Sequence, residues 1–142
     1  YPDFPPDGEM KIPKLKQILS LKGRIVHIHE AHDHEGVSYG HTYIAKGTRK
    51  IATVPLGYAD GIPRGLSNKI SGILNGQKVP QIGNITMDQM MFDITGIEAQ
   101  PGDVITLLDE NNTIDEWAKI LNTINYELTC RLKVRLPRVY TR

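Results

Sequence analysis

Short runs of β-favouring residues, each ended by turn-forming residues, constrain the fold of this chain more than any other feature. Asn75 and Gly76 form the clearest turn, because this dipeptide tolerates the positive φ angles of a two-residue hairpin. It predicts that strands at residues 70–74 and 77–82 pair with each other. Further strands are expected at residues 17–28, 37–45, 51–56, 85–94 and 104–108. So many short strands indicate a barrel or a sandwich, in which 37–45 and 51–56 are neighbours.

The hydrophobic period changes only near the end of the chain. Thr113 followed by Glu116 has the spacing of a capping box. The apolar residues after Thr113 recur at helical spacing: Ile114, Trp117, Ile120 and Leu121. We therefore expect a short amphipathic helix, a second helical turn at residues 123–130 and a final strand at 132–136.

Length and charge set limits on the partners of the chain. Its 142 residues suit one domain, and a net charge of +1 gives no reason to expect nucleic acid. One cysteine excludes an internal disulfide framework, and no apolar run approaches the roughly 20 residues that cross a bilayer. We expect a cytoplasmic protein without a membrane partner. The proline-rich residues 1–13 are interpreted as a linker or a remnant of a preceding domain.

Several segments resemble the signature blocks of alanine racemases. In chain order they are LKGRIVHI, VSYGHTY, TVPLGYADGIPRGLSN, GNITMDQMMFDI and TINYELTCRL, followed by LPRVY. The resemblance implies that residues 14–142 are the C-terminal domain of that family. Its fold would be mainly β, a closed Greek-key-like antiparallel barrel with one or two short helices near the C-terminus. In the family a (β/α)8 barrel precedes this domain and holds pyridoxal 5′-phosphate on a lysine.

The resemblance also implies a catalytic role for Tyr39. Racemisation needs one base on each face of a planar intermediate, and the cofactor stores the electrons of the broken bond. In the family one base is the cofactor lysine and the other is the tyrosine of the SYG block, which is Tyr39 here. From residue pattern alone, Tyr39 could equally be a strand aromatic that packs on the core.

The other blocks imply a substrate site around Tyr39. Met87 would bind the substrate carboxylate through its backbone N–H, with support from Asp88. Tyr58, Arg64 and Ile124 would line the entrance of the site. Without the resemblance, these positions would be interpreted as turn or core residues.

A cofactor contact and several partners follow from the same resemblance. Tyr126 would donate a hydrogen bond to the cofactor phosphate. The partners would be the (β/α)8 barrels of the same chain and of a second subunit, in a head-to-tail homodimer that interconverts L- and D-alanine for peptidoglycan synthesis. Because the lysine belongs to the missing barrel, these residues alone are expected to be inactive.

One departure from the family pattern leaves alternatives open. Most relatives carry arginine where this chain has Asn84, so one cation of the substrate entrance is missing. This favours a serine or broad-specificity racemase, whereas Tyr126 disfavours it. From another class, a small β-barrel could be a module that binds oligonucleotides or peptides, and a decarboxylase built from the same two domains is a third possibility.

The histidine run HIHEAHDH is a weak sign of metal binding. His27 and His29 share a strand face, but solvated histidines explain the run without a metal, and we predict no metal site. Cys130 is expected to be a buried small hydrophobic residue and not a nucleophile.

Overall fold

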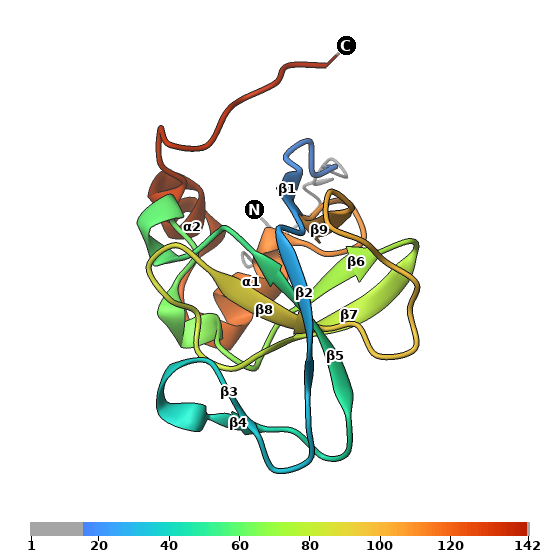
Figure 1. Ribbon diagram of the computed structural model, residues 1–142. Coiled ribbons are helices and arrows are strands. Elements are labelled where there is room, and N and C mark those ends of the chain that lie inside the picture. Colours follow the sequence, from blue (N-terminus) through green and yellow to red (C-terminus); the bar gives the residue numbers. More distant parts are fainter. Residues whose placement is uncertain (1–15, 142) are drawn as a thin grey trace, which may run out of the picture.

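The computed structural model describes residues 16–141 and shows a mainly β domain with helices on one side (Figure 1). Seven antiparallel strands form the main sheet, in the order β1-β9-β6-β7-β8-β5-β2. Their bounds are Leu21–Arg24 (β1), His27–Ala31 (β2), Arg49–Val54 (β5), Ser71–Leu74 (β6), Gln77–Ile82 (β7), Met90–Asp93 (β8) and Val104–Leu108 (β9). The sheet curls into a half-barrel, which confirms the expected mainly β, antiparallel fold class.

One continuous segment joins the two ends of the sheet. β1 and β2 are successive parts of residues 21–31, and β1 pairs with β9 whereas β2 pairs with β5. Between them, the Ile25 N–H donates to the Asp103 carbonyl at 2.8 Å. The Val26 N–H donates to the Thr53 carbonyl at 2.9 Å. The two edge strands of the half-barrel are therefore consecutive parts of one backbone segment, and the sheet does not close by pairing β1 with β2.

Short elements fill the connections between the strands. β3 (Gly36–Val37) and β4 (Tyr43–Ile44) form a separate two-stranded sheet. The 3-10 helices are η1 (Tyr39–His41), η2 (Tyr58–Asp60) and η3 (Arg64–Leu66), and the α-helices are α1 (Ile114–Leu121) and α2 (Asn125–Arg131). Within residues 16–141, no helix has the length and apolarity that crossing a membrane requires.

Aliphatic side chains and one phenylalanine fill the half-barrel. Phe92 on β8 is fully buried and lies opposite the small Ala52 of β5, so the pair fills space without overlap. Trp117 covers the core from α1 and is 2% exposed. A second, smaller cluster contains Ala31, Val37, Ala45, Ile51 and Ile82.

The hairpin expected at Asn75 and Gly76 is confirmed. Both residues have positive φ, 49° and 76°, and Leu74 pairs with Gln77 across the turn. The strand expected at residues 104–108 is also confirmed. Local turn chemistry and β propensity are sufficient to define these elements.

Three other strand predictions are wrong in extent or pairing. Residues 17–28 bend and divide into β1 and the start of β2, and only the end of 85–94 forms a strand, β8. Residues 37–45 are interrupted by η1, where Ser38, Gly40 and His41 have positive φ. Such a backbone cannot continue a strand, so β3 pairs with β4 and not with β5.

The C-terminal helices are confirmed, but two details beside them differ from expectation. The Thr113 side chain makes no capping hydrogen bond, and the Gln17 Oε1 atom accepts the Ile114 N–H at 3.0 Å instead. Cys130 on α2 is exposed, because the buried side of this short helix is occupied by Leu128.

No strand forms at residues 132–136, although apolar residues alternate there. Leu132 and Leu136 pack against the main core, whereas Val134 is 96% exposed. The Leu136 N–H donates to the Lys133 carbonyl at 3.3 Å, so the segment turns. The alternation reflects this turn and not a pleated strand. The predicted linker at residues 1–13 lies outside the described residues.

Candidate active-site surface

The loop at residues 83–89, between β7 and β8, connects most of the expected site residues. In Figure 1 this loop lies at the left of the view, between the η1 segment below it and α2 above it. Its first residues contact the η1 segment, and its later residues contact η2 and the segment after α2. Segments far apart in the sequence therefore meet at one surface, which we call the 83–89 surface.

Tyr39 projects from one side of this surface. It is the first residue of η1 and is 78% exposed. The Asn84 side-chain amide donates to the Tyr39 carbonyl at 2.7 Å. The Ser38 hydroxyl in turn donates to the Asn84 carbonyl at 2.8 Å. The backbone beside Tyr39 is therefore held while its phenol faces outward.

Tyr58 and Met87 are brought together by paired backbones. The Tyr58 N–H donates to the Thr86 carbonyl, and the Ala59 N–H donates to the Met87 carbonyl, both at 3.0 Å. A Cβ on Gly57 would lie 2.2 Å from the Thr86 oxygen, so only glycine allows this approach. Tyr58 and Met87 are about half exposed and lie on adjacent loops.

Asp88 is held by a cation of the same chain. The Arg135 Nη2 atom donates to Asp88 Oδ1 at 2.9 Å, and its Nε lies 3.5 Å from Asp60 Oδ1. Asp60 is 4% exposed, and its other oxygen accepts the Gly57 N–H at 2.9 Å. The hydrogen bond to Asp88 and the charge of Asp60 raise the pKa of Arg135 above its ordinary value.

The remaining expected residues lie on the neighbouring short helices. Arg64 is exposed at the start of η3, and its carbonyl accepts the Ser67 hydroxyl at 2.6 Å. Ile124 is the N-cap of α2, Tyr126 lies within α2, and both are more than half exposed. The end of helix α2 packs closely against the end of η2. A Cβ on Gly61, the C-cap of η2, would lie 2.0 Å from the carbonyl oxygen of Arg131, the last residue of α2.

Sequence reasoning missed two residues that build this surface. Arg135 links two carboxylates that lie 75 and 47 residues before it in the chain, and no local pattern signals such a contact. Asn68 links the other end of the η1 segment to the 83–89 loop. Its Oδ1 accepts the Gly83 N–H at 2.6 Å, and its Nδ2 donates to Thr42 Oγ1 at 3.1 Å. An asparagine before a strand is a turn signal, but it does not reveal its partners.

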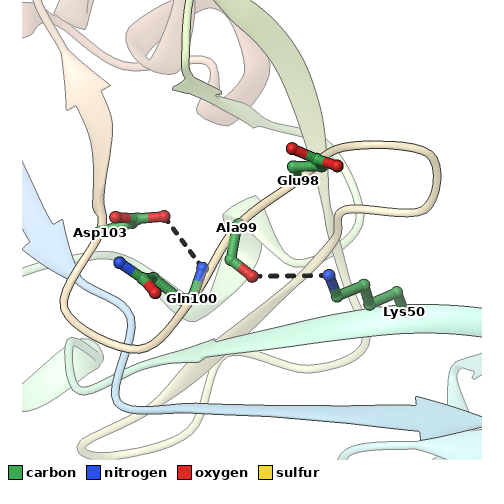
Figure 2. Close-up of a pocket in the computed structure, with 5 residues that line it drawn as sticks. All are labelled: Lys50, Glu98, Ala99, Gln100 and Asp103. Atoms are coloured by element: carbon green, nitrogen blue, oxygen red, sulfur yellow. Dashed lines mark hydrogen bonds between the residues drawn. The ribbon is translucent and has the colours of Figure 1, made fainter.

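A separate hollow of about 400 Å³ lies beside β5 (Figure 2). It is lined by Lys50, Glu98, Ala99, Gln100 and Asp103. Two of its polar groups are already used, because the Lys50 ammonium donates to the Ala99 carbonyl and Asp103 accepts the Gln100 N–H. None of the expected site residues lines this hollow.

The histidine run begins on β2 with His27 and His29 and continues into the turn after it with His32 and His34. The rings of His27 and His29 stack with centroids 5.5 Å apart. Burial and the charge of His27 lower the pKa of His29, while Glu35 acts in the opposite direction. Within residues 16–141, no three histidine, cysteine or acidic side chains come together in a way that could hold a metal ion.

The structure is thus a mainly β half-barrel that presents tyrosines and a methionine on one loop surface. The particular family is settled by sequence. The chain belongs to the family described as alanine racemase, C-terminal domain, whose profile matches residues 18–140. This family differs from the two alternatives, a module that binds nucleic acid or peptides and a decarboxylase.

Individual relatives agree with this assignment. The chain is 48% identical over 130 residues to an alanine racemase of Nostoc sp., a match that covers 88% of this chain and 34% of the relative. The alanine racemase structure from the D-cycloserine producer Streptomyces lavendulae is 34% identical, with a TM-score of 0.85 and coverage of 90% and 35%. The Bartonella henselae enzyme, described with covalently bound pyridoxal phosphate, is 30% identical, with a TM-score of 0.81 and coverage of 86% and 34%. The chain thus spans about a third of the length of the relatives it matches.

Proposed function

We propose that this chain is the C-terminal domain of a pyridoxal-phosphate-dependent alanine racemase. It would supply Tyr39 as a base to an active site that the (β/α)8 barrel of a second subunit holds. The observation that supports this most is the 83–89 surface, which gathers Tyr39, Tyr58 and Met87 in exposed positions. Exposed aromatic and apolar side chains gathered in this way are typical of a surface that another protein surface covers.

Tyr39 would move the Cα proton on one face of the substrate. As a phenolate, its Oη would accept the Cα proton of L-alanine and become a phenol, and in the reverse direction the phenol would return a proton to the same face. A tyrosine with a pKa of about 10 serves as a base at neutral pH only beside groups that favour the phenolate. The partner barrel would provide these groups.

The other residues would bind and admit the substrate. The backbone N–H of Met87 would donate to the substrate carboxylate, and Asp88 would fix this loop through its ion pair with Arg135. Tyr58, Arg64 and Ile124 would line the entrance. A backbone donor binds an anion whatever the side chain, so a methionine suits this position.

The residues of this chain fit the edge of a cofactor site. Tyr126 is about half exposed on α2, and a phenol there can donate a hydrogen bond to a phosphate oxygen. When bound to a lysine of the barrel, pyridoxal 5′-phosphate would take up the electrons of the broken Cα–H bond. The name of the Bartonella henselae structure supports the cofactor assignment.

The assembly would be a head-to-tail homodimer. Two-fold symmetry then places the Tyr39 of each subunit at the barrel of the other, so that the dimer has two mixed sites. Its product, D-alanine, would be used in peptidoglycan synthesis.

Replacing Tyr39 by phenylalanine in the full-length enzyme tests this proposal. Because each base serves one face, Cα–H exchange of L-alanine in deuterated water should fall by roughly 10²- to 10⁴-fold, whereas exchange of D-alanine is largely kept. Phenylalanine retains the ring, so a loss of packing cannot produce the asymmetry. Equal losses for both enantiomers would show that Tyr39 has a structural role only.

A further inference from the structure

The segment that carries Tyr39 has an unfavourable backbone. Ser38 and His41 have φ angles of 65° and 45°, although neither is glycine, and Gly40 has a φ of 72°. Positive φ is strained at a residue with a side chain, so contacts from outside the segment must maintain this conformation. The hydrogen bond that the His41 N–H donates to the Ser38 carbonyl is long, at 3.4 Å.

Two asparagines supply such contacts from opposite ends of the segment. The Asn84 amide holds the Tyr39 carbonyl at 2.7 Å, and the Asn68 amide holds the Thr42 hydroxyl at 3.1 Å. Asn68 also accepts the Gly83 N–H, so both asparagines connect to the start of the 83–89 loop. That loop is seated closely, since a Cβ on Gly83 would lie 2.7 Å from the Val37 carbonyl.

We infer that Asn84 is a positioning residue that sets the place of the Tyr39 phenol, with Asn68 as its second support. The inference rests on the proposed function of Tyr39 as a base. Asn84 acts through the Tyr39 backbone, because its side-chain amide donates to the Tyr39 carbonyl. Asn84, which stands where most relatives carry arginine, would therefore act by fixing geometry and not through a charge.

The test uses a variant that removes one donor and little else. Asn84→Asp keeps the size of the side chain, but a carboxylate cannot donate to the Tyr39 carbonyl. Asn75→Asp is the matched control, because the Asn75 amide also donates to a backbone carbonyl, that of Glu98, at the β6–β7 turn. Asn68→Asp removes the donor to Thr42 and keeps the acceptor for Gly83, so it tests the second support.

The first measurement needs no cofactor and uses the 142-residue chain. From backbone ¹⁵N relaxation, we expect order parameters of about 0.85 for Tyr39 and Gly40, both in the unmodified chain and in Asn75→Asp. In Asn84→Asp we expect values below about 0.6, with the β6–β7 hairpin unchanged. A segment that stays rigid in Asn84→Asp, or one that is already flexible in the unmodified chain, would overturn the inference.

The second measurement links the contact to catalysis in the full-length enzyme. Misplacing a base by about 1 Å costs up to about a hundredfold, so Asn84→Asp should slow L-alanine exchange by about ten- to a hundredfold and spare D-alanine exchange. In a Tyr39→Phe background, Asn84→Asp should cause less than about a twofold further loss. Additive losses in the double variant would overturn the inference.

Failure of the two ideas can be told apart. If Tyr39→Phe does not affect the enantiomers unequally, the proposed role of Tyr39 fails, whatever Asn84→Asp does. If Tyr39→Phe gives the asymmetry and Asn84→Asp does not, the base is correct and the positioning role of Asn84 is wrong.

Discussion

Two carboxylates share the Arg135 side chain, and their burial differs greatly. The side chain of Asp60 is 6% exposed and that of Asp88 is 55% exposed. A buried carboxylate depends on its partners, because water cannot replace them. Asp60 therefore stabilises the fold, whereas Asp88 mainly fixes the loop that carries Met87.

We predict unequal effects when these two carboxylates are neutralised. Asp60→Asn weakens the hydrogen bond to the Gly57 N–H and removes the charge that faces Arg135, so the free energy of unfolding should fall by about 1–3 kcal/mol. Asp88→Asn breaks an exposed pair and should cost no more than about 1 kcal/mol. Chemical denaturation of both variants measures the difference, and equal losses would contradict the assignment.

At the level of residues, the sequence could suggest candidate site residues, but it could not predict which residues contact each other. Tyr39 and Met87 could be proposed as site residues because they lie in short blocks that resemble the family. Arg135 and the contact between Asn84 and Tyr39 could not, because their partners are distant in sequence and the contacts depend on how loops meet. Hydrogen-bond partners between loops are a property of the folded chain and have no local period.

Individual elements meet at a few close approaches, of which Gly61 is the tightest. A Cβ there would lie 2.0 Å from the Arg131 carbonyl at the end of α2. Gly102 has a similar φ, 102° compared with 105°, but nothing lies within 4 Å of its Cβ position. Substitutions at these two glycines therefore distinguish the energetic cost of a positive φ angle, which both share, from the cost of a steric clash, which only Gly61 has.

We predict that Gly61→Ala destabilises the chain more than Gly102→Ala. Both substitutions introduce strain of about 1–2 kcal/mol from positive φ, but only Gly61→Ala must also displace the end of α2. Thermal unfolding should show a markedly lower midpoint for Gly61→Ala. Similar midpoints for both variants would mean that α2 moves away from η2 at little cost.

His29 on strand β2 predicts a pH dependence of stability. Burial and His27 lower the pKa of His29 in the folded chain below the unfolded value of about 6.5. The unfolded chain therefore binds this proton more readily, so stability is retained above about pH 6.5 and decreases as the pH falls below it. We expect a lower denaturation midpoint at about pH 5.5 than at about pH 7.5.

Single variants assign this pH effect to its source. His29→Gln removes the lowered pKa and should reduce the difference between the two pH values. His32→Gln changes an exposed histidine of the turn after β2 and should leave the difference unchanged. An unchanged difference in His29→Gln would show that another group is responsible.

Elements defined by local chemistry were predicted well, and those defined by distant partners were not. The hairpin at Asn75 and Gly76 needs only its own turn, and α1 needs only its apolar face. Residues 37–45 were predicted as one strand because their composition favours β structure. The positive φ angles at Ser38 and His41, which interrupt the strand, cannot be predicted from composition. Residues 132–136 alternate like a strand, but the segment turns between contacts with the core.

For the molecule as a whole, we predict that these 142 residues alone do not racemise alanine. The proposed site needs the cofactor lysine and phosphate-binding loops of the (β/α)8 barrel. The purified chain mixed with pyridoxal 5′-phosphate should show no turnover and no protein-bound visible absorbance that borohydride abolishes. Measurable racemisation by the chain alone would contradict the proposed division of the site.

The continuous segment at residues 21–31 also sets an order of assembly. β6 and β7 are joined by a two-residue turn and can pair as soon as they are made, whereas β1 pairs with β9, with Leu21 opposite Leu108. Closing so long a loop is slow, because chain entropy is lost before the contact is gained. We therefore expect β1 to pair only after β9 has formed. Until then, the backbone N–H and C=O groups of β1 that will bond to β9 are unpaired and can bond to other chains.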